Sequence, residues 1–271
     1  MTVRLILVGC GNMGYAMLSG WLKSGRLSPA EVFVAEPNAT LRDRAKELGA
    51  QTGKEAADLP DGSRPEIVVI AVKPQAVREV LDSYRGLGTG AATFLSIVAG
   101  TPVATFEKVL GVGTPVVRCM PNTPAAIGQG MMVLFANQHV RPETQAQIAD
   151  LLSVSGAVAA IWDESLMDAV TAVSGSGPAY VFHFIECLGK AGEATGLPRD
   201  TARMLALQTV FGAACLAAET GTDPGELRRQ VTSPNGTTAA ALDILMNADE
   251  LQTLLSRAVE AAQRRSVELG R

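Results

Sequence analysis

The feature that most constrains the fold is a glycine-rich turn between an apolar run and a helix-like stretch near the start of the chain. Residues 9–14 fit the pattern GxGxxG and directly follow the strand-like segment Val3–Val8. Such glycines allow a tight turn, a close approach of the backbone to a pyrophosphate, and close packing of a helix on a strand. The start of the helix would then present free N–H groups to the phosphates. We therefore predict a dinucleotide site, with a purely structural turn as the alternative. The residues expected to bind the cofactor here are Gly9, Cys10, Gly11, Asn12, Met13 and Gly14.

Apolar runs alternate with helix-like stretches in the first half of the chain, which predicts an α/β fold with a mostly parallel, doubly wound sheet. The expected strands are Val3–Val8, Glu31–Ala35, Ile67–Val72, Thr93–Val98, Pro115–Met120, Met131–Phe135 and Ala157–Ile161. From Asp163 onward the pattern is almost entirely helical and rich in alanine. We therefore expect two domains, residues 1–162 and 163–271. The helical domain is expected to bury its apolar positions against a second copy, because so short a helical segment forms a thin core alone.

The composition of the chain argues against several functional classes. The net charge is −4 and the charged residues are scattered, so the basic stripe that nucleic-acid binding requires is missing. The four cysteines form no CxxC pair and the two histidines lack a ligating pattern, so we expect no metal site. Reduced, mostly buried thiols are typical of a cytoplasmic protein, and Cys119 is expected to be such a thiol rather than a nucleophile. The chain opens directly on a strand-like run and has no run of about 18 uncharged apolar residues, so we expect neither a signal peptide nor a membrane span.

Further candidate cofactor contacts follow the later strands. Glu36 ends the second expected strand, where an acidic residue commonly takes a ribose hydroxyl. A carboxylate there repels a 2′-phosphate, so NADH is favoured over NADPH. Arg42 and Arg44 weaken that preference unless they belong to a solvated helix face. Lys73 has two interpretations, a cofactor contact and a solvated charge. The residues expected at the carboxyl edge of the sheet are Ala71, Val72, Lys73, Pro74, Ile97, Val98 and Ala99.

A hydroxyl-rich segment, Ser233–Thr238, lies between two helical stretches in the second half of the chain. Hydroxyls and free amides at the start of a helix can hold a carboxylate without any arginine. The alternative is an N-cap with no further role. The spacing of the residues alone favours neither.

With these motifs in place, the whole chain resembles the pyrroline-5-carboxylate reductases, which form proline with NAD(P)H. The segments that carry the resemblance are Gly9–Gly14, Ala71–Pro74, Arg118–Pro124, Val173–Tyr180 and, most specifically, Val231–Thr238 with Ala241–Asp243 behind it. The resemblance implies an N-terminal Rossmann domain and a C-terminal all-α dimerisation domain. It also implies a small-molecule substrate and interlocked homodimers, which in several members assemble into a decamer of five dimers.

The resemblance also implies roles for individual residues. It places Glu164, Ser233, Gly236, Thr237 and Thr238 at the substrate and Gln230 at the cofactor. Thr238 is the implied catalytic residue. Three positions depart from the family pattern. Glu36 stands where many members have an uncharged residue, Gly53 should lack an adenosine contact that some members make, and Asn235 replaces a commoner glycine.

The implied substrate is a cyclic imine whose ring nitrogen can arrive protonated, so its carbon is already electrophilic. The enzyme then mainly has to position the two reactants, with Thr238 hydrogen-bonded to the ring nitrogen. Two other classes of NAD(P)-binding protein share the glycine turn. Dehydrogenases of the β-hydroxyacid or ketopantoate type use a lysine early in the helical domain, and the stretch Asp163–Tyr180 has none. A non-catalytic NAD(P) sensor would have no use for the loop Ser233–Thr238.

Overall fold

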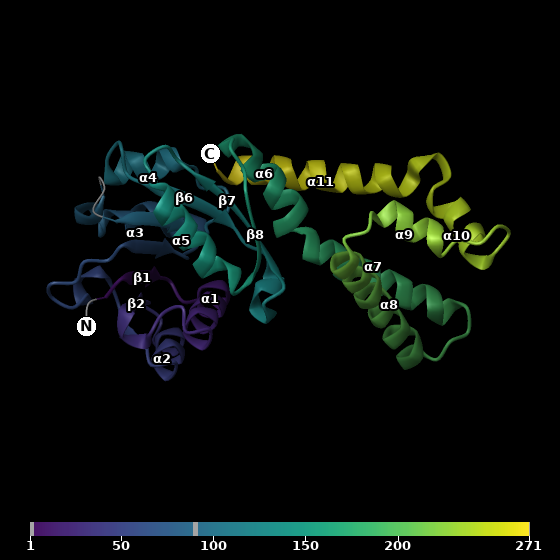
Figure 1. Ribbon diagram of the computed structural model, residues 1–271, viewed down its shortest axis with the longest axis horizontal. Coiled ribbons are helices and arrows are strands. Elements are labelled where there is room, and N and C mark those ends of the chain that lie inside the picture. The colour runs from purple at the N-terminus through teal and green to yellow at the C-terminus, as the bar shows by residue number, and fades with distance from the viewer. Residues whose placement is uncertain (1–2, 89–91, 271) are drawn as a thin grey trace. The chain divides into compact units, whose positions relative to one another are not determined.

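The computed structural model describes residues 3–88 and 92–270. Its first part is an eight-stranded sheet in the order β3-β2-β1-β4-β5-β6-β7-β8 (Figure 1). Neighbouring strands are parallel except β6 and β7. The strands are β1 (Leu5–Val8), β2 (Val32–Ala35), β3 (Gln51–Gly53), β4 (Ile67–Ile70), β5 (Thr93–Ser96), β6 (Val116–Met120), β7 (Gly130–Ala136) and β8 (Gly156–Ala160). Because β1 pairs with both β2 and β4, the strand order reverses at β1, and ligands of such sheets bind at the carboxyl ends of the strands at this point.

The predicted α/β class and the mostly parallel, doubly wound sheet are confirmed. Each expected strand is present, and several are shorter than expected by one or two residues. The sequence did not predict β3, which has three residues, two of them polar, and pairs with β2 at the edge of the sheet. So short and polar a segment lacks the apolar pattern by which a strand is recognised.

Helices cover both faces of the sheet. The helices on one face are α1 (Asn12–Lys23), α2 (Ala39–Glu47) and α5 (Pro142–Ser153), and those on the other are α3 (Val77–Asp82) and α4 (Val103–Leu110). Each face has its own apolar core, so β1 and β4 are buried along their whole length. This double burial explains why their sequences are continuously apolar. On the first face the buried indole of Trp21 donates to the carbonyl of Leu151 at 2.9 Å and ties α1 to α5.

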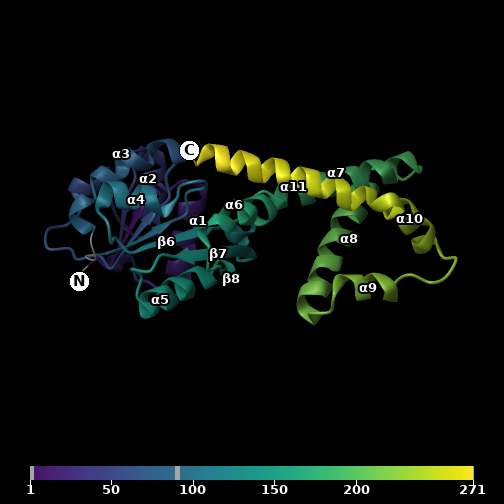
Figure 2. The same cartoon turned by 90° about the horizontal axis from the view of Figure 1, so that it is seen from above.

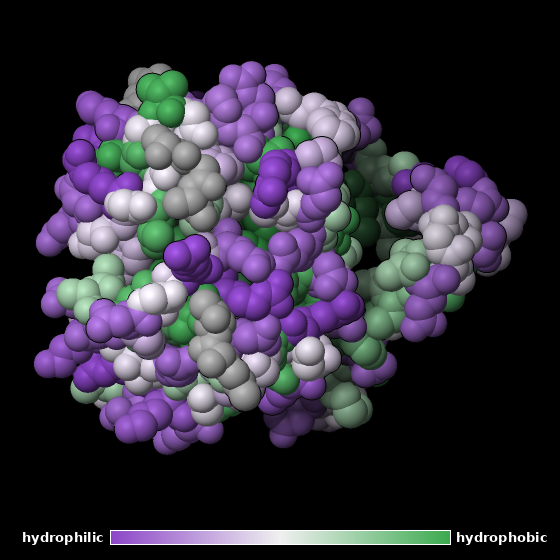
Figure 3. Space-filling model, turned by 60° about the vertical axis from the view of Figure 1, so that its left-hand side comes forward, coloured by the Kyte–Doolittle hydropathy of each residue, from purple (hydrophilic) through white to green (hydrophobic). Residues whose placement is uncertain are grey.

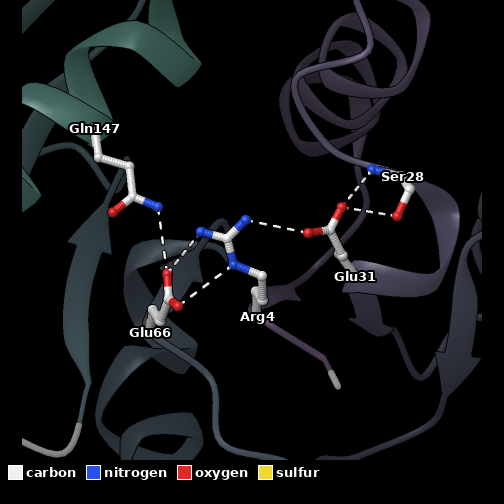
Figure 4. A network of polar contacts seen from close by, with 5 residues as sticks. All are labelled: Arg4, Ser28, Glu31, Glu66 and Gln147. Atoms are coloured by element: carbon white, nitrogen blue, oxygen red, sulfur yellow. Dashed lines mark hydrogen bonds and ion pairs between the residues drawn. The ribbon is translucent and has the colours of Figure 1, made fainter. Parts of the chain in front are cut away.

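A polar network closes the amino-terminal edge of the sheet (Figure 4). Arg4, just before β1, pairs with Glu31 at 3.1 Å and with Glu66 at 3.0 Å. Gln147 donates to Glu66 at 3.4 Å, which extends the network to α5. The N–H and hydroxyl of Ser28, and then Arg4, donate to Glu31 and lower the pKa of its carboxyl to about 2. The network joins the starts of β1, β2 and β4, at the edge opposite to the one where ligands bind.

The second part of the chain is helical. Its elements are α6 (Met167–Val170), α7 (Gly177–Ala194), α8 (Arg199–Thr220), α9 (Pro224–Gln230), α10 (Thr237–Leu245) and α11 (Glu250–Leu269). Residues 177–261 pack as one unit, whereas the preceding segment and the end of α11 pack with the sheet. This division falls later than the change from strands to helices that defined the expected boundary at residue 162. α11 is one long helix (Figure 2), and near its end the Ser266 hydroxyl donates to Asp168 of α6 at 2.6 Å.

The two units differ in their surfaces. The outer face of the sheet unit is mainly hydrophilic, with only scattered apolar residues (Figure 3). Large exposed apolar side chains are frequent in the helical unit and include Phe182, Phe184, Leu207, Phe211 and Ile244. Within the described ranges, α8 is the one helix that is long and apolar enough to cross a membrane by length and composition alone. A helix that packs against another protein chain meets the same criterion.

Candidate active site

The glycine turn has the geometry that a dinucleotide requires. Gly9 has φ +90°, and a Cβ there would lie 2.7 Å from the carbonyl oxygen of Ala71. A Cβ at Gly14 would lie 2.5 Å from the carbonyl oxygen of Gly9, so this glycine allows α1 to pack closely. At Gly11, in contrast, no atom lies within 4 Å of the position of a Cβ, which leaves the backbone open to a ligand. α1 begins at Asn12 without a side-chain cap, so its first N–H groups are available to phosphates.

Glu36 lies at the end of β2 and faces the glycine turn. Its carboxylate accepts hydrogen bonds from the N–H of Cys10 at 2.7 Å and from the N–H of Asn38 at 2.9 Å. The residue is only 6% exposed, yet it lines a cavity of about 720 Å³ at the ends of β1, β2 and β4. Burial, and then the charge of Glu36, raises the pKa of the Cys10 thiol to about 11. Cys10 therefore stays protonated near neutral pH and contributes its backbone N–H.

The arginine and lysine side chains near Glu36 make different contacts. Arg42 donates to the backbone carbonyls of Glu36 at 2.8 Å and Pro37 at 3.0 Å, so it supports the turn after β2. The guanidinium of Arg44 lies over the ring of Tyr15, 4.0 Å from its centroid. Neither arginine lines the large cavity, which two lysines, Lys54 and Lys73, do line. Sequence reasoning missed Lys54 because it follows the unpredicted strand β3.

A smaller cavity of about 290 Å³ adjoins the large one and shares Ala71 and Val72 with it. Its lining residues are Met13, Ala71, Val72, Ile97, Met120, Pro121, Asn122, Thr123 and Gly175. The two cavities together form a cleft along the carboxyl ends of β1, β2, β4, β5 and β6. The glycine turn, which is expected at the pyrophosphate, lies at the large cavity, and the small cavity continues from it along the carboxyl edge of the sheet. The open backbone at Gly11 and the size of the cleft fit an extended dinucleotide.

The structure brings most of the predicted cofactor residues to this cleft. The residues that line it are Gly9, Gly11, Met13, Glu36, Ala71, Val72, Lys73 and Ile97. Asn12 lines a further cavity beside α1, which shares Met13 and Thr123 with the small cavity, and Pro74 lines one beside the end of α11. Val98 is 5% exposed and packs in the core beneath the loop. Cys119 is buried, and burial raises the pKa of its thiol, as expected for a structural cysteine.

Glu164, expected at the substrate, accepts two hydrogen bonds within the sheet unit. Its Oε1 accepts from the Arg118 guanidinium at 2.7 Å and from the N–H of Val103 at 2.8 Å. The Arg118 side chain is 8% exposed, so this carboxylate balances an almost buried charge in β6. The pair also joins the segment after β8 to the first turn of α4. Arg118 belongs to one of the segments that carry the family resemblance, but no local pattern indicates its pairing with Glu164, 46 positions away.

The hydroxyl-rich loop lies in the helical unit and has the expected local form. Asn235 has φ +57°, a left-handed conformation that asparagine tolerates, and the N–H of Gly236 donates to the Ser233 carbonyl at 3.0 Å. α10 begins at Thr237, so Thr238 lies in its first turn, where N–H groups have no acceptor within the helix. Gln230 ends α9, and its side chain donates to Glu226 at 3.5 Å.

Comparison with known proteins identifies the family. The family model described as pyrroline-5-carboxylate reductase dimerisation matches residues 164–269, and that described as NADP oxidoreductase, coenzyme F420-dependent, matches residues 4–100. The pyrroline-5-carboxylate reductase of Pseudomonas aeruginosa is 40% identical over 273 residues, which cover 99% of this chain and 97% of that protein.

Solved structures agree with this result. The pyrroline-5-carboxylate reductase of Coxiella burnetii matches with a TM-score of 0.93 and 32% identity over 100% of both chains. The Plasmodium falciparum pyrroline carboxylate reductase with NADP bound matches with a TM-score of 0.83 and 29% identity over 99% of this chain and 98% of that one. The glycine turn, the cleft and the hydroxyl-rich loop thus occur together in a chain that belongs to the pyrroline-5-carboxylate reductase family.

Proposed function

We propose that the protein reduces 1-pyrroline-5-carboxylate to L-proline with NAD(P)H, the last step of proline biosynthesis. The observation that carries this proposal is the combination, in one chain, of two features. One is a dinucleotide cleft lined by Gly9, Gly11 and Ala71, and the other is a hydroxyl-rich turn at the start of α10. The first suits a nicotinamide cofactor. The second suits the carboxylate of a small substrate.

The bound cofactor would supply a hydride from C4 of the reduced nicotinamide. The hydride adds to the imine carbon, the C=N π electrons pass to nitrogen, and the proton that the nitrogen carried on arrival stays there. When the imine arrives protonated, no strong acid has to be supplied by the chain. The two histidines agree with this, because His139 and His183 lie outside the residues that line the cleft. The protein therefore acts mainly by placing the two carbons within about 3–3.5 Å of each other.

We assign Thr238 the hydrogen bond to the ring nitrogen of the substrate, and Ser233, Gly236 and Thr237 the binding of its carboxylate. The first N–H groups of α10 and the positive end of its dipole favour a negative group at this position. We place Gln230 at the cofactor and Glu164 next to the substrate site, where it holds Arg118. These assignments extend the family resemblance to individual residues of this chain.

We also propose that NADH is the preferred cofactor. The carboxylate of Glu36 is fixed at the wall of the large cavity and would repel the 2′-phosphate of NADPH. Arg42 and Arg44 do not line that cavity, so they weaken the repulsion only from a distance, as the charge of Arg44 acts on the Cys10 thiol. Lys54 and Lys73 do line it, and their positive charges reduce the repulsion and so limit the preference for NADH.

The dimerisation domain supports a homo-oligomer, which we propose is a dimer that can assemble further into a decamer of five dimers. The exposed apolar residues of α7 and α8 are then covered by the second copy. This arrangement accounts for the apolar length of α8 without a membrane. We place the protein in the cytoplasm and expect no nucleic-acid partner.

Oxidation of NADH and NADPH, followed with and without 1-pyrroline-5-carboxylate, tests the function directly. Turnover that depends on the imine is expected, and proline should accumulate in equal amount. Cofactor binding without turnover would instead identify a sensor. Turnover of a β-hydroxyacid in place of the imine would point to the other class of two-domain dehydrogenase, although Asp163–Tyr180 has no lysine to serve it.

A further inference from the structure

Asn122 follows β6 and uses both ends of its side chain at the small cavity. Its Oδ1 accepts a hydrogen bond from the N–H of Met131 in β7 at 2.9 Å. Its Nδ2 donates to the carbonyl oxygen of Ser174 at 3.2 Å and approaches the Ser174 hydroxyl at 3.4 Å. The side chain therefore links the loop after β6 to two other segments, and it also lines the cavity.

The segment that Asn122 holds is a π-helical turn, Thr171–Gly175. Its wider hydrogen bonding is seen where the N–H of Ser176 donates to the carbonyl of Thr171 at 2.9 Å. Short π-helical turns are rare and are found mostly at functional sites. Gly175, at the end of the turn, forms part of the cavity wall and lies against the Met120 side chain, which would have to move if this glycine carried a Cβ. Through Gly175, the π-helical turn contributes to the wall of the small cavity, which we take as the nicotinamide end of the cleft.

We propose that Asn122 is a positioning residue for hydride transfer, because it fixes this π-helical wall against the loop after β6. The inference rests on the proposed function and adds a residue to it. Hydride transfer requires the two carbons to be within a few tenths of an ångström of their reactive separation, and a displacement of about 1 Å can lower the rate about a hundredfold. A side chain that ties this wall to the loop after β6 would control that separation without touching the substrate.

A matched control is available at the other end of the same two strands. Asn137 follows β7, and its Oδ1 accepts from the N–H of Val116 at 3.1 Å at the start of β6. Its Nδ2 donates to the carbonyl of Thr114 at 2.9 Å. Asn137 therefore makes the same kind of side-chain link between backbone segments as Asn122, but it lies outside the residues that line the cleft. Its substitution should affect stability alone.

The test compares Asn122→Ala, Asn122→Asp and Asn137→Ala with the wild type. Asn122→Asp keeps an acceptor for the N–H of Met131 but cannot donate to Ser174, and it carries the test if Asn122→Ala does not fold. For both Asn122 variants we expect kcat to fall about tenfold to a hundredfold, while the Kd for NADH stays within about threefold. The primary isotope effect on kcat with NADH deuterated at the transferred position should be at least as large as in the wild type. For Asn137→Ala we expect a lower Tm with kcat and the isotope effect unchanged.

The outcomes separate this inference from the proposed function. If the wild type does not turn over 1-pyrroline-5-carboxylate, the proposed function is wrong and the inference is wrong with it. If the wild type is active and the Asn122 variants keep their kcat, only the inference is wrong. It is equally wrong if Asn122 and Asn137 variants lose kcat in proportion to their loss of Tm, because Asn122 would then be a structural residue only.

Discussion

Removal of the charge of Glu36 is expected to shift the cofactor preference toward NADPH. The carboxylate is held at the cavity wall by the N–H groups of Cys10 and Asn38, so it cannot turn away from a 2′-phosphate without losing both hydrogen bonds. Two like unit charges in contact repel by about 1 kcal/mol in water and by about 4 kcal/mol near a protein surface. Exposed side chains such as Lys54 line the same cavity, so water and these cations reduce the repulsion. We expect a change of about 1.4 to 2.7 kcal/mol, which is about tenfold to a hundredfold in specificity.

The variant Glu36→Gln preserves the shape of the side chain and removes its charge. The amide has one oxygen, so one of the two N–H groups that the carboxylate accepts, those of Cys10 and Asn38, faces an NH₂ group instead. A buried donor left without a partner costs about 1–3 kcal/mol, so a lower Tm should accompany the change in preference. The cofactor ratio separates the two effects, because a loss of stability affects NADH and NADPH equally.

The assay is kcat/KM for NADH and for NADPH at saturating 1-pyrroline-5-carboxylate, expressed as the NADPH-to-NADH ratio. Glu31→Gln is the matched control, because Glu31 directly precedes β2 and Glu36 directly follows it. This control removes the same charge at the opposite edge of the sheet, so its ratio should equal that of the wild type. A Glu36→Gln ratio within twofold of the wild type would refute the reasoning, and so would a strong NADPH preference in the wild type itself.

Three further predictions concern the substrate loop and the two charged clusters. Thr238→Ala should lower kcat/KM for the imine by about tenfold or more, the effect of one lost oriented hydrogen bond, and unchanged steady-state kinetics would remove Thr238 from the mechanism. Glu164→Ala leaves the nearly buried Arg118 unpaired and the N–H of Val103 without its acceptor. Because Glu164 itself is 29% exposed, we expect the free energy of unfolding, measured in urea, to fall by about 2–4 kcal/mol. An unchanged urea midpoint would contradict this. The pKa of Glu31 is lowered to about 2, so its charged form stabilises the fold above the unfolded pKa of about 4.3, and that contribution is lost as the pH falls toward 2. Glu31→Gln should therefore lose less stability over this range than the wild type, as judged by urea midpoints at several pH values.

The sequence predicted what depends on local pattern and left open what depends on distant contacts. β1, the turn at Gly9 and the helix that follows are adjacent in the chain, so their motif could be recognised and placed. The hydrogen bond between Glu36 and the N–H of Cys10 joins residues 26 positions apart, and the bonds of Asn122 to Ser174 span 52 positions. No local pattern specifies such pairs. Lys54 was not predicted for a different reason. It directly follows β3, and β3 is too short and too polar to be predicted from the sequence, so the carboxyl end of that strand could not be located.

These distant contacts share one feature that bears on the chemistry. At the carboxyl edge of the sheet, two polar side chains that follow strands and line the cleft are bound to neighbouring segments: Glu36 to the glycine turn and Asn122 to the π-helical turn. The walls of the cleft are therefore fixed by contacts within the sheet unit before any ligand arrives. Such preorganisation suits a reaction in which the imine is already activated and the rate depends on placement rather than on proton transfer by the protein. A cleft built for acid–base catalysis would instead need a titratable group directed at the reacting atoms, and the small cavity is lined by none among the residues that the structure describes.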